Sequence, residues 1–335
     1  MTTSGNRQFL LDSVPGGKLA RDHFRLVESP VPEPAEGEAL VRTRYISMDA
    51  ANRAWMQGAT YRSALTGGTV MAGGGIGEVV SSRTPGLAPG DLVYGGLGWQ
   101  DYAALPGEEL RKLERSDPLT HHLSIYGIPG LTTYFGLTEC GQPRAGETVL
   151  VSAAAGAVGS LVGQVAKAMG CRTIGITGGP EKCALLTEEL GFDAALDYKA
   201  EGSLRKRLRE IAPDGVDVYF DSVAGDILEA AIFNMAMNGR IVCCGAIAHY
   251  DGAPPEAGPR GIPGLLVTRR LTMRGFIVFD FDDRRDAALA QLETWVREGR
   301  IHVREDIVDG FEQLPDALLG VLAGGNVGKR MVRIA

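Results

Sequence analysis

The residues best suited to chemistry form a turn of small side chains, Ala154-x-Gly156-x-x-Gly159. A pyrophosphate can approach such a backbone closely, and a following helix would offer it free N–H groups and a positive dipole end. The flanks fit this reading, because Thr148 to Ser152 alternate like a strand and apolar residues from Val158 to Met169 recur at helical spacing. The turn therefore predicts a dinucleotide site. The alternative is a glycine-rich structural turn, since alanine replaces the first glycine of the usual fingerprint.

The second predicted strand of this unit indicates which dinucleotide would bind. NAD sites place a carboxylate about 20 residues past the glycine turn. Here the run TIGIT leads into Gly178, Gly179 and Pro180, and Lys182 follows. An ammonium attracts a ribose 2′-phosphate and a carboxylate would repel it, so the pattern favours NADPH over NADH. Lys182 could instead be a solvated surface lysine, and Glu181 beside it weakens the signal.

Bulk composition limits the function classes. The chain has 335 residues, 44% of them hydrophobic, and a formal net charge of −7, which predicts two lobes and argues against a nucleic-acid partner. The N-terminal segment lacks the apolar region of a signal peptide, and no apolar run is long enough to span a membrane. The five cysteines lack paired spacing, which fits a reducing compartment. We therefore expect a cytoplasmic protein.

The rhythm of the chain changes near residue 127. Before it, short β-like runs separated by Pro and Gly predict a compact, barrel-like lobe, with strands at Glu38 to Met48, Gly75 to Ser82 and Gly90 to Gly96. After it, strands and helices alternate, which predicts a doubly wound parallel sheet. The expected strands are Thr148 to Ser152, Thr173 to Thr177, Val216 to Phe220, Arg240 to Cys244 and Met273 to Phe279; the expected helices are Glu181 to Leu190, Ser203 to Ile211, Ile227 to Met237 and Asp283 to Glu298.

These patterns predict an α/β fold with two domains. Residues 128–301 would form a Rossmann domain, and residues 1–127 with 302–335 would form the second, mostly β domain. The tail is predicted to form a helix and a strand, and it would fold back on the N-terminal, barrel-like lobe. The Pro- and Gly-rich segment from Ala248 to Pro263 is either a binding lid or a flexible linker.

Several chemistries lack their residues in this sequence. A catalytic zinc needs about three Cys, His or carboxylate ligands, yet no cysteine precedes Cys140 and no CxxC spacing occurs. His121 and His122 lie beside the predicted domain junction and read as structural. The GxSxG elbow of acyl transfer and the P-loop of phosphoryl transfer are also missing. These exclusions leave a nicotinamide-dependent enzyme without a metal.

The run from Gly127 to Lys167 resembles the zinc-independent medium-chain dehydrogenase/reductase superfamily. It is most similar to the branch of prostaglandin reductases, leukotriene B4 dehydrogenases and bacterial curcumin or 2-alkenal reductases. Further resemblance lies in YFDSVAGDILEAA, GRIVCCGAIAHYDG, RGFIVFDF, GGNVGKRMV and SMDAANRAWM. The resemblance implies a Rossmann domain, a GroES-like catalytic domain, and NADPH-dependent reduction of the C=C bond of α,β-unsaturated ketones and aldehydes.

The same resemblance implies the site residues. Gly156, Ala157, Val158 and Gly159 would cradle the pyrophosphate, and Lys182 and Tyr198 would contact the 2′-phosphate. The nicotinamide end would be lined by Cys244, Gly245, Ala246, Ile247 and Tyr250, with Phe276, Ile277, Val278 and Phe279 at the carboxamide and Asn326 from the tail. Two departures occur: Ser222 stands where relatives often have asparagine, and Ala50-Ala51-Asn52 where many have Pro-Tyr-Met.

For catalysis, the resemblance makes Tyr250 the expected hydrogen-bond donor to the substrate oxygen, with Tyr61 as a second pocket residue. Tyr250 could instead be a loop tyrosine that only packs. A quinone reductase or an enoyl-thioester reductase is the alternative activity, and a non-catalytic NADPH sensor is a third. A homodimer through the edge strand near RGFIVFDF is expected.

Overall fold

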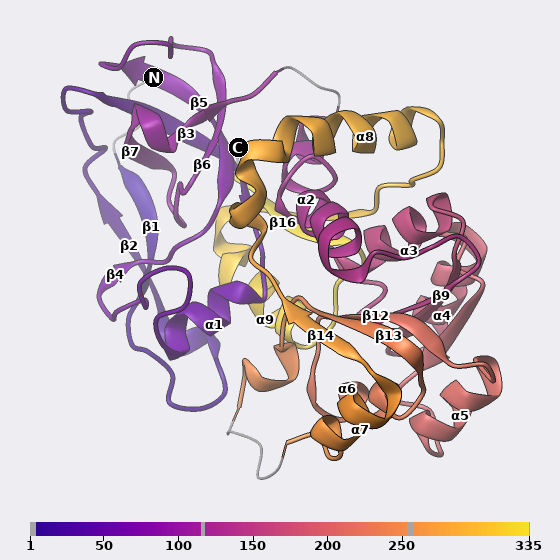
Figure 1. Cartoon of the computed structure of the whole chain (residues 1–335). Helices are drawn as coiled ribbons and strands as arrows, with labels where there is room; N and C mark the ends of the chain where they lie inside the picture. The colour runs from indigo at the N-terminus through magenta and orange to yellow at the C-terminus, as the bar shows by residue number, and fades with distance from the viewer. Residues whose placement is uncertain (1–4, 115–117, 253–257, 335) are drawn as a thin grey trace.

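The structure is a computed structural model that describes residues 5–114, 118–252 and 258–334. Its chain forms two lobes, one around a parallel sheet covered by helices and the other built mostly of strands (Figure 1). This confirms the predicted fold class. The exact domain limits stay a prediction.

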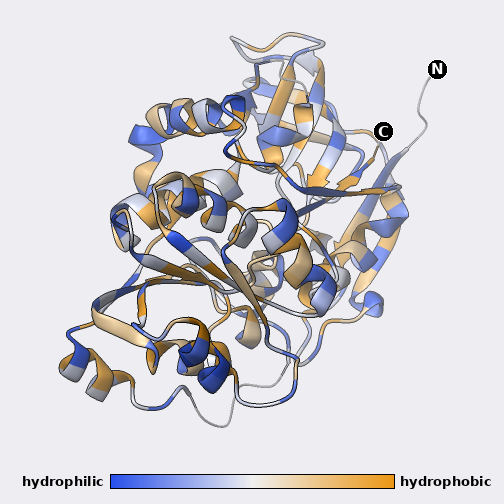
Figure 2. Cartoon of the chain, turned by 90° about the vertical axis from the view of Figure 1, so that its right-hand side faces the viewer, coloured by the Kyte–Doolittle hydropathy of each residue, from blue (hydrophilic) through white to orange (hydrophobic). Residues whose placement is uncertain are grey.

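The first lobe is organised by a six-stranded parallel sheet in the order β11-β10-β9-β12-β13-β14. Alternate residues of β9 enter different cores: Val149 and Val151 pack with one cluster and Leu150 with another. Because both faces are covered at its centre, β9 (TVLV) is almost entirely apolar, while the sheet as a whole mixes orange with white and blue segments (Figure 2). The strands are β9 (Thr148–Val151), β10 (Arg172–Thr177), β11 (Ala194–Asp197), β12 (Val216–Asp221), β13 (Met235–Cys243) and β14 (Thr272–Gly275).

Helices on both sides of this sheet bury one apolar stripe each. Leu161, Val162 and Val165 of α3 join the core of Val149, while Leu228 and Ile232 of α6 join the core of Leu150. The helices are α2 (Ile128–Phe135), α3 (Gly159–Ala168), α4 (Pro180–Ala184), α5 (Leu204–Ile211), α6 (Gly225–Ile232), α7 (Ile262–Arg269) and α8 (Arg285–Arg297). None of the helices in the described ranges is both long and apolar enough to cross a membrane.

The second lobe joins the N-terminal strands to the C-terminal tail. Strand β16 of the tail pairs antiparallel with β3, which confirms that the tail folds back on this lobe. Its strands are β1 (Asn6–Leu11), β2 (Phe24–Ser29), β3 (Glu38–Ser47), β4 (Thr69–Val70), β5 (Gly75–Ser82), β6 (Leu92–Gly95), β7 (Tyr102–Pro106), β8 (Arg111–Lys112), β15 (Glu305–Asp309) and β16 (Lys329–Arg333); its helices are α1 (Ala51–Gln57) and α9 (Leu314–Leu322).

The structure corrects four sequence expectations. The strand expected to reach Phe279 ends at Gly275, because the chain leaves the sheet there and Phe276 to Phe279 line a cavity. The helix expected to reach Met237 ends at Ile232, since Met235 is fully buried and pairs with Val216 at the start of β13. Strand β13 therefore begins five residues before the expected Arg240. The sequence patterns also did not predict helices α1, α2 and α7 or strands β11 and β15.

The segment from Ala248 to Pro263 is only partly described. Its start lies in a 3₁₀ turn, Ile247–His249, and its end begins helix α7. Residues 253–257 lie outside the described residues, so the choice between lid and linker stays open.

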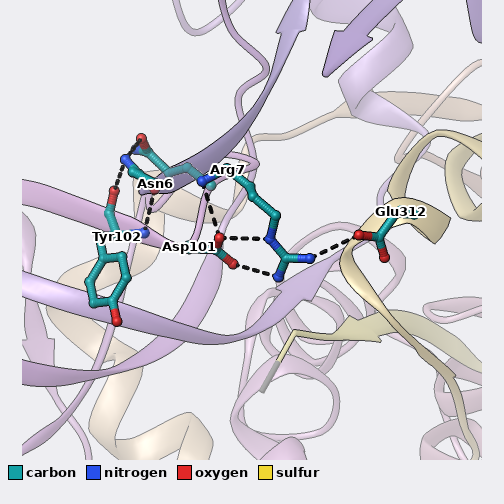
Figure 3. A network of polar contacts seen from close by, with 6 residues as sticks. Asn6, Arg7, Asp101, Tyr102 and Glu312 are labelled. Atoms are coloured by element: carbon teal, nitrogen blue, oxygen red, sulfur yellow. Dashed lines mark hydrogen bonds and ion pairs between the residues drawn. The ribbon is translucent and has the colours of Figure 1, made fainter. Parts of the chain in front are cut away.

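A polar network ties the N-terminal strand to the tail (Figure 3). Fully buried Asn6 accepts a hydrogen bond from the Tyr102 N–H at 2.9 Å and donates to the Tyr102 carbonyl at 3.0 Å. Next to it, Arg7 donates to both carboxylate oxygens of Asp101, at 2.9 and 3.0 Å, and to Glu312 of the tail at 2.8 Å. The network therefore holds strand β1, the chain at residues 101–102 and the C-terminal tail together.

Replacing Asn6 with leucine is expected to lower the free energy of unfolding by about 2–4 kcal/mol. The leucine side chain has a similar size, but it would remove both buried hydrogen bonds that Asn6 makes to the Tyr102 backbone. Urea unfolding followed by circular dichroism measures the effect. Glu312→Gln is the control, because its bond to Arg7 is exposed and should matter by less than about 1 kcal/mol; equal stability of Asn6→Leu and wild type would contradict the prediction.

Candidate dinucleotide and substrate site

A cavity of about 650 Å³ lies between the two lobes. Its walls come from the carboxyl ends of the parallel strands, from the start of α1 and from the tail after α9. Open α/β sheets bind ligands at this edge, because the strand ends and helix starts leave backbone groups free there.

The structure brings the predicted site residues together. All of them line this cavity except Ala246: Tyr61, Gly156, Ala157, Val158, Gly159, Lys182, Tyr198, Ser222, Cys244, Gly245, Ile247, Tyr250, Phe276, Ile277, Val278, Phe279 and Asn326. Ala246 instead donates its backbone N–H to the Tyr250 hydroxyl at 3.1 Å. What these residues contact in the working protein stays a prediction.

The glycine turn is tight because Gly156 and Gly159 both pack against the carbonyl oxygen of Ala153. A Cβ at Gly159 would lie 2.4 Å from the carbonyl oxygen of Ala153, too close for any side chain. Ala153 itself has a φ of +48°, a left-handed conformation that costs an alanine about 1 kcal/mol. Helix α3 begins at Gly159, and the N–H groups of Ser160, Leu161 and Val162 in its first turn bond to carbonyls of the glycine turn. A strained backbone with no room for a side chain at Gly159 therefore lies where a pyrophosphate would approach.

The tail closes over this turn. Gly328 donates its N–H to the Ala155 carbonyl at 2.7 Å, and Gly156 and Gly328 form an isolated bridge. Lys182 donates to the carbonyls of Gly324 and Asn326, at 2.7 and 2.6 Å. The Asn326 amide donates to the Gly328 carbonyl at 2.8 Å, which shapes the same loop.

Three cations share the end of the cavity near β10. Lys182, Lys199 and Arg330 all line it, and only Arg330 has a carboxylate partner there, Asp306, among the described residues. Burial lowers the pKa of Lys182, and the neighbouring Lys199 and Arg330 lower it further. Like charges held together in a partly buried site need an anion. An ammonium has three donors, and the two tail carbonyls leave one of Lys182 available.

The carboxylate that the sequence lacks at the end of β10 is supplied nearby by β11. Asp197 ends that strand and accepts the N–H groups of Gly179 and Lys199, both at 2.9 Å. These bonds lower the pKa of Asp197. Its carboxylate is therefore bound to the backbone, and the residues that line the cavity at this end are cationic or neutral.

The opposite end of the cavity has two phenols. The Tyr250 oxygen accepts the Ala246 N–H, and the Tyr61 oxygen accepts the Trp55 indole N–H, both at 3.1 Å. Each hydroxyl proton is therefore free to be donated elsewhere. Burial raises the pKa of both phenols, and the Asp49 carboxylate adds to the effect at Tyr61. Both are neutral donors at neutral pH.

The Asp49 carboxylate, at the same end of the cavity, is bound by a residue of the C-terminal tail. The ammonium of Lys329, fully buried on β16, donates to the Asp49 carboxylate and, at 3.0 Å, to the Met48 carbonyl. The hydroxyl of Ser47 donates to the other Asp49 oxygen. Sequence reasoning missed this pair and Arg330, because the pairing of β16 with β3 brings distant residues together. It also missed Lys199, which comes shortly after the unpredicted strand β11 beside β10.

Ser222 and Cys244 complete the wall. The Ser222 hydroxyl is buried beside the Cys244 thiol, and apart from that thiol it has no hydrogen-bond partner within the part of the chain that is described. A buried polar atom without a partner indicates a missing ligand or water. Burial raises the pKa of the Cys244 thiol to about 12, so it stays protonated. Together with the tight turn and the cation cluster, the orphaned hydroxyl fits a dinucleotide phosphate.

Comparison with known proteins gives a consistent result. A family model described as the N-terminal domain of oxidoreductase matches residues 7–113, and one described as zinc-binding dehydrogenase matches residues 157–294. The second description names a metal, yet no cluster of three His, Cys, Asp or Glu side chains that could hold one occurs in residues 5–114, 118–252 and 258–334.

Three relatives cover almost the whole chain. The NADPH-dependent curcumin reductase of Escherichia coli is 39% identical over 98% of this chain and 97% of its own. The NADP-dependent 2-alkenal reductase of Nicotiana tabacum is 38% identical over 92% of this chain and 90% of its own. The crystal structure of CurA from Vibrio vulnificus in complex with NADPH has a TM-score of 0.94, with 38% identity over 98% of this chain and 99% of its own.

Proposed function

Because this chain belongs to the zinc-independent branch of the medium-chain dehydrogenase/reductase superfamily, we propose that it reduces the C=C bond of α,β-unsaturated ketones and aldehydes. It is an oxidoreductase whose cofactor is NADPH. The observation that supports the finer activity is the pair of phenols, Tyr61 and Tyr250, with free protons in the cavity of the glycine turn.

The chain's own residues would hold the cofactor along the cavity. The turn from Gly156 to Gly159 would receive the pyrophosphate, and Lys182 would donate its third N–H to the 2′-phosphate. Lys199, Arg330 and Tyr198 would surround that phosphate. The nicotinamide would lie near Cys244, Tyr250 and the 276–279 segment, with Asn326 shaping the tail that closes over it. When bound, NADPH supplies a hydride.

The phenols would act on the charge that this reduction creates. Addition of hydride to the β-carbon leaves negative charge on the substrate oxygen as an enolate. Tyr250 donates its free proton in a hydrogen bond to that oxygen, which supplies the stabilisation that a metal would otherwise provide. The α-carbon is then protonated by the phenol or by water. Tyr61, half exposed at the cavity mouth, is placed to bind the substrate.

The cavity wall also suits an electrophilic substrate. Enones react with thiolates, and Cys244 lies on the wall. Because its pKa is raised to about 12, the thiolate form is almost absent at neutral pH, and the thiol is a poor nucleophile.

The test is turnover of enones with NADPH deuterated at the transferred position. A saturated ketone with deuterium on the β-carbon, identified by NMR, supports the proposal. Matched assays on quinones and on enoyl thioesters test the alternative activities. Binding of NADPH without hydride transfer to any of the three would contradict the proposal and would support the sensor alternative.

The pH dependence follows from the raised pKa of Tyr250. Its ordinary value is near 10, and burial moves it upward, so the donor form persists through neutral and mildly alkaline pH. We expect kcat on an enone to vary less than about threefold from pH 6 to pH 9 and to fall only as pH rises above about 10. Stopped-flow rates of the hydride step measure this profile. A decline through pH 7–8 would show that another group controls the step.

A homodimer in the cytoplasm is also part of this proposal. Strand β14 lies at the edge of the six-stranded sheet, and its backbone groups there are available to a second copy. The thiols of Cys140, Cys171, Cys183, Cys243 and Cys244 are free, which fits a reducing compartment. Sedimentation equilibrium should give twice the monomer mass at micromolar concentration; a monomer at every concentration tested would contradict the dimer.

A further inference from the structure

The segment that contains Tyr250 is bound from two sides. After β13, residues 247–251 form a short bridge between the lobes, which we call the Tyr250 segment. On the side of the parallel sheet, Ile247 and Ala248 donate to the carbonyls of Ser222 and Val223, at 3.2 and 3.1 Å. The other side of the segment contacts helix α1, which lies in the strand-rich lobe near the boundary between the lobes (Figure 1).

Helix α1 holds the backbone of this segment directly. The side-chain amide of Gln57 donates to the carbonyls of both His249 and Tyr250, at 3.1 and 3.0 Å. These two bonds cross from one lobe to the other at Tyr250 and its neighbour, and Tyr250 lines the cavity.

A buried ion pair reinforces the same contact. Arg53, four residues before Gln57 on α1, is 1% exposed and donates to the Asp251 carboxylate at 3.1 Å. The same Asp251 oxygen accepts the Leu19 N–H at 2.6 Å, and Arg53 also donates to the Gly17 carbonyl at 2.6 Å. Desolvating a charge pair is costly, so such a pair contributes more to a defined geometry than to stability.

We propose that Arg53, Gln57 and Asp251 are positioning residues that hold the Tyr250 segment against α1 and so keep the Tyr250 phenol in the cavity. Arg53, Gln57 and Asp251 act through backbone and loop contacts, while the cavity wall of α1 is made by Ala51 at its first turn. The inference rests on the proposed role of Tyr250. It adds that this role depends on contacts across the two lobes.

The test uses the full-length protein with Gln57→Leu, Asp251→Asn and Arg53→Met. Hydrogen exchange with mass spectrometry should show at least about tenfold faster exchange of the amides in residues 247–251 in each variant. With an enone substrate, kcat should fall about tenfold while the Kd for NADPH stays within about twofold. Arg53→Lys keeps the charge and should restore part of the loss.

Asp309→Asn is the matched control, because it breaks an exposed ion pair with Arg333 on strands β15 and β16, and neither residue bonds to the segment or to its partners on α1. It should leave exchange and kcat unchanged. Gln57 is exposed, so Gln57→Leu will fold even if the buried variants do not.

Two results would overturn the inference: unchanged exchange at residues 247–251 in Gln57→Leu, or faster exchange with unchanged kcat. If the wild-type protein reduces no enone, the proposed function fails. The exchange measurement still tests the contact between α1 and the segment in that case.

Discussion

Replacing Lys182 with methionine is expected to weaken NADPH binding by about 10- to 100-fold and to leave NADH binding within about threefold of wild type. The two cofactors differ only in the 2′-phosphate, and Lys182 has one N–H left for it after its bonds to the carbonyls of Gly324 and Asn326. Burial, and then repulsion from Lys199 and Arg330, lower the pKa of Lys182, and a bound phosphate would relieve that repulsion.

Comparing the two cofactors separates two roles of this lysine. Losing the bonds to the tail would loosen the loop at Gly324 and weaken NADPH and NADH equally. Losing the phosphate contact weakens NADPH alone. Isothermal titration calorimetry measures both Kd values. Lys167→Met is the control, because Lys167 pairs with Asp193 on the exposed side of α3; an equal loss for both cofactors in Lys182→Met would mean that the lysine only supports the tail.

How far the sequence could predict this site depends on how local each contact is. The strand, glycine turn and helix around Gly156 follow from residues close in the chain, and their periodicity was enough to locate them. Strand β10 and Lys182 were found for the same reason. The limits of β13 and β14 were wrong because tertiary pairing decided them: Met235 joins the sheet through Val216, and Phe276 leaves it for the cavity.

Contacts between distant parts of the chain could not be predicted. Strand β10 ends without a carboxylate, but Asp197 at the end of the neighbouring β11 lies beside it, with its carboxylate bound by two backbone N–H groups. The positive charge at this end comes in part from Arg330, more than 140 residues after Lys182. The returning tail brings these residues together, through the Lys182 bonds to the carbonyls of Gly324 and Asn326 and through the Gly328 bond to Ala155. A pattern of residues along the chain does not reveal contacts between segments this far apart.

Replacing Tyr250 with phenylalanine is expected to lower kcat on an enone by about 100-fold, which is the typical loss for one hydrogen-bond donor to a developing oxyanion. Binding of NADPH should stay within about twofold, since the phenyl ring still fills the cavity wall. Tyr61→Phe should lower kcat less and raise KM more, because Tyr61 is half exposed at the mouth and keeps its ring contact with Phe279. Steady-state kinetics with one enone measure kcat and KM for both variants.

A structural effect of the same substitution has to be separated from the chemical one. Phenylalanine also removes the acceptor of the Ala246 N–H, which could release the Tyr250 segment. Hydrogen exchange of residues 247–251 distinguishes the two: unchanged exchange with a 100-fold lower kcat assigns the loss to the missing donor. Tyr126→Phe, at the domain junction and away from the cavity, should behave like wild type. If Tyr61→Phe instead causes the large loss in kcat and Tyr250→Phe does not, the phenol that stabilises the enolate is Tyr61.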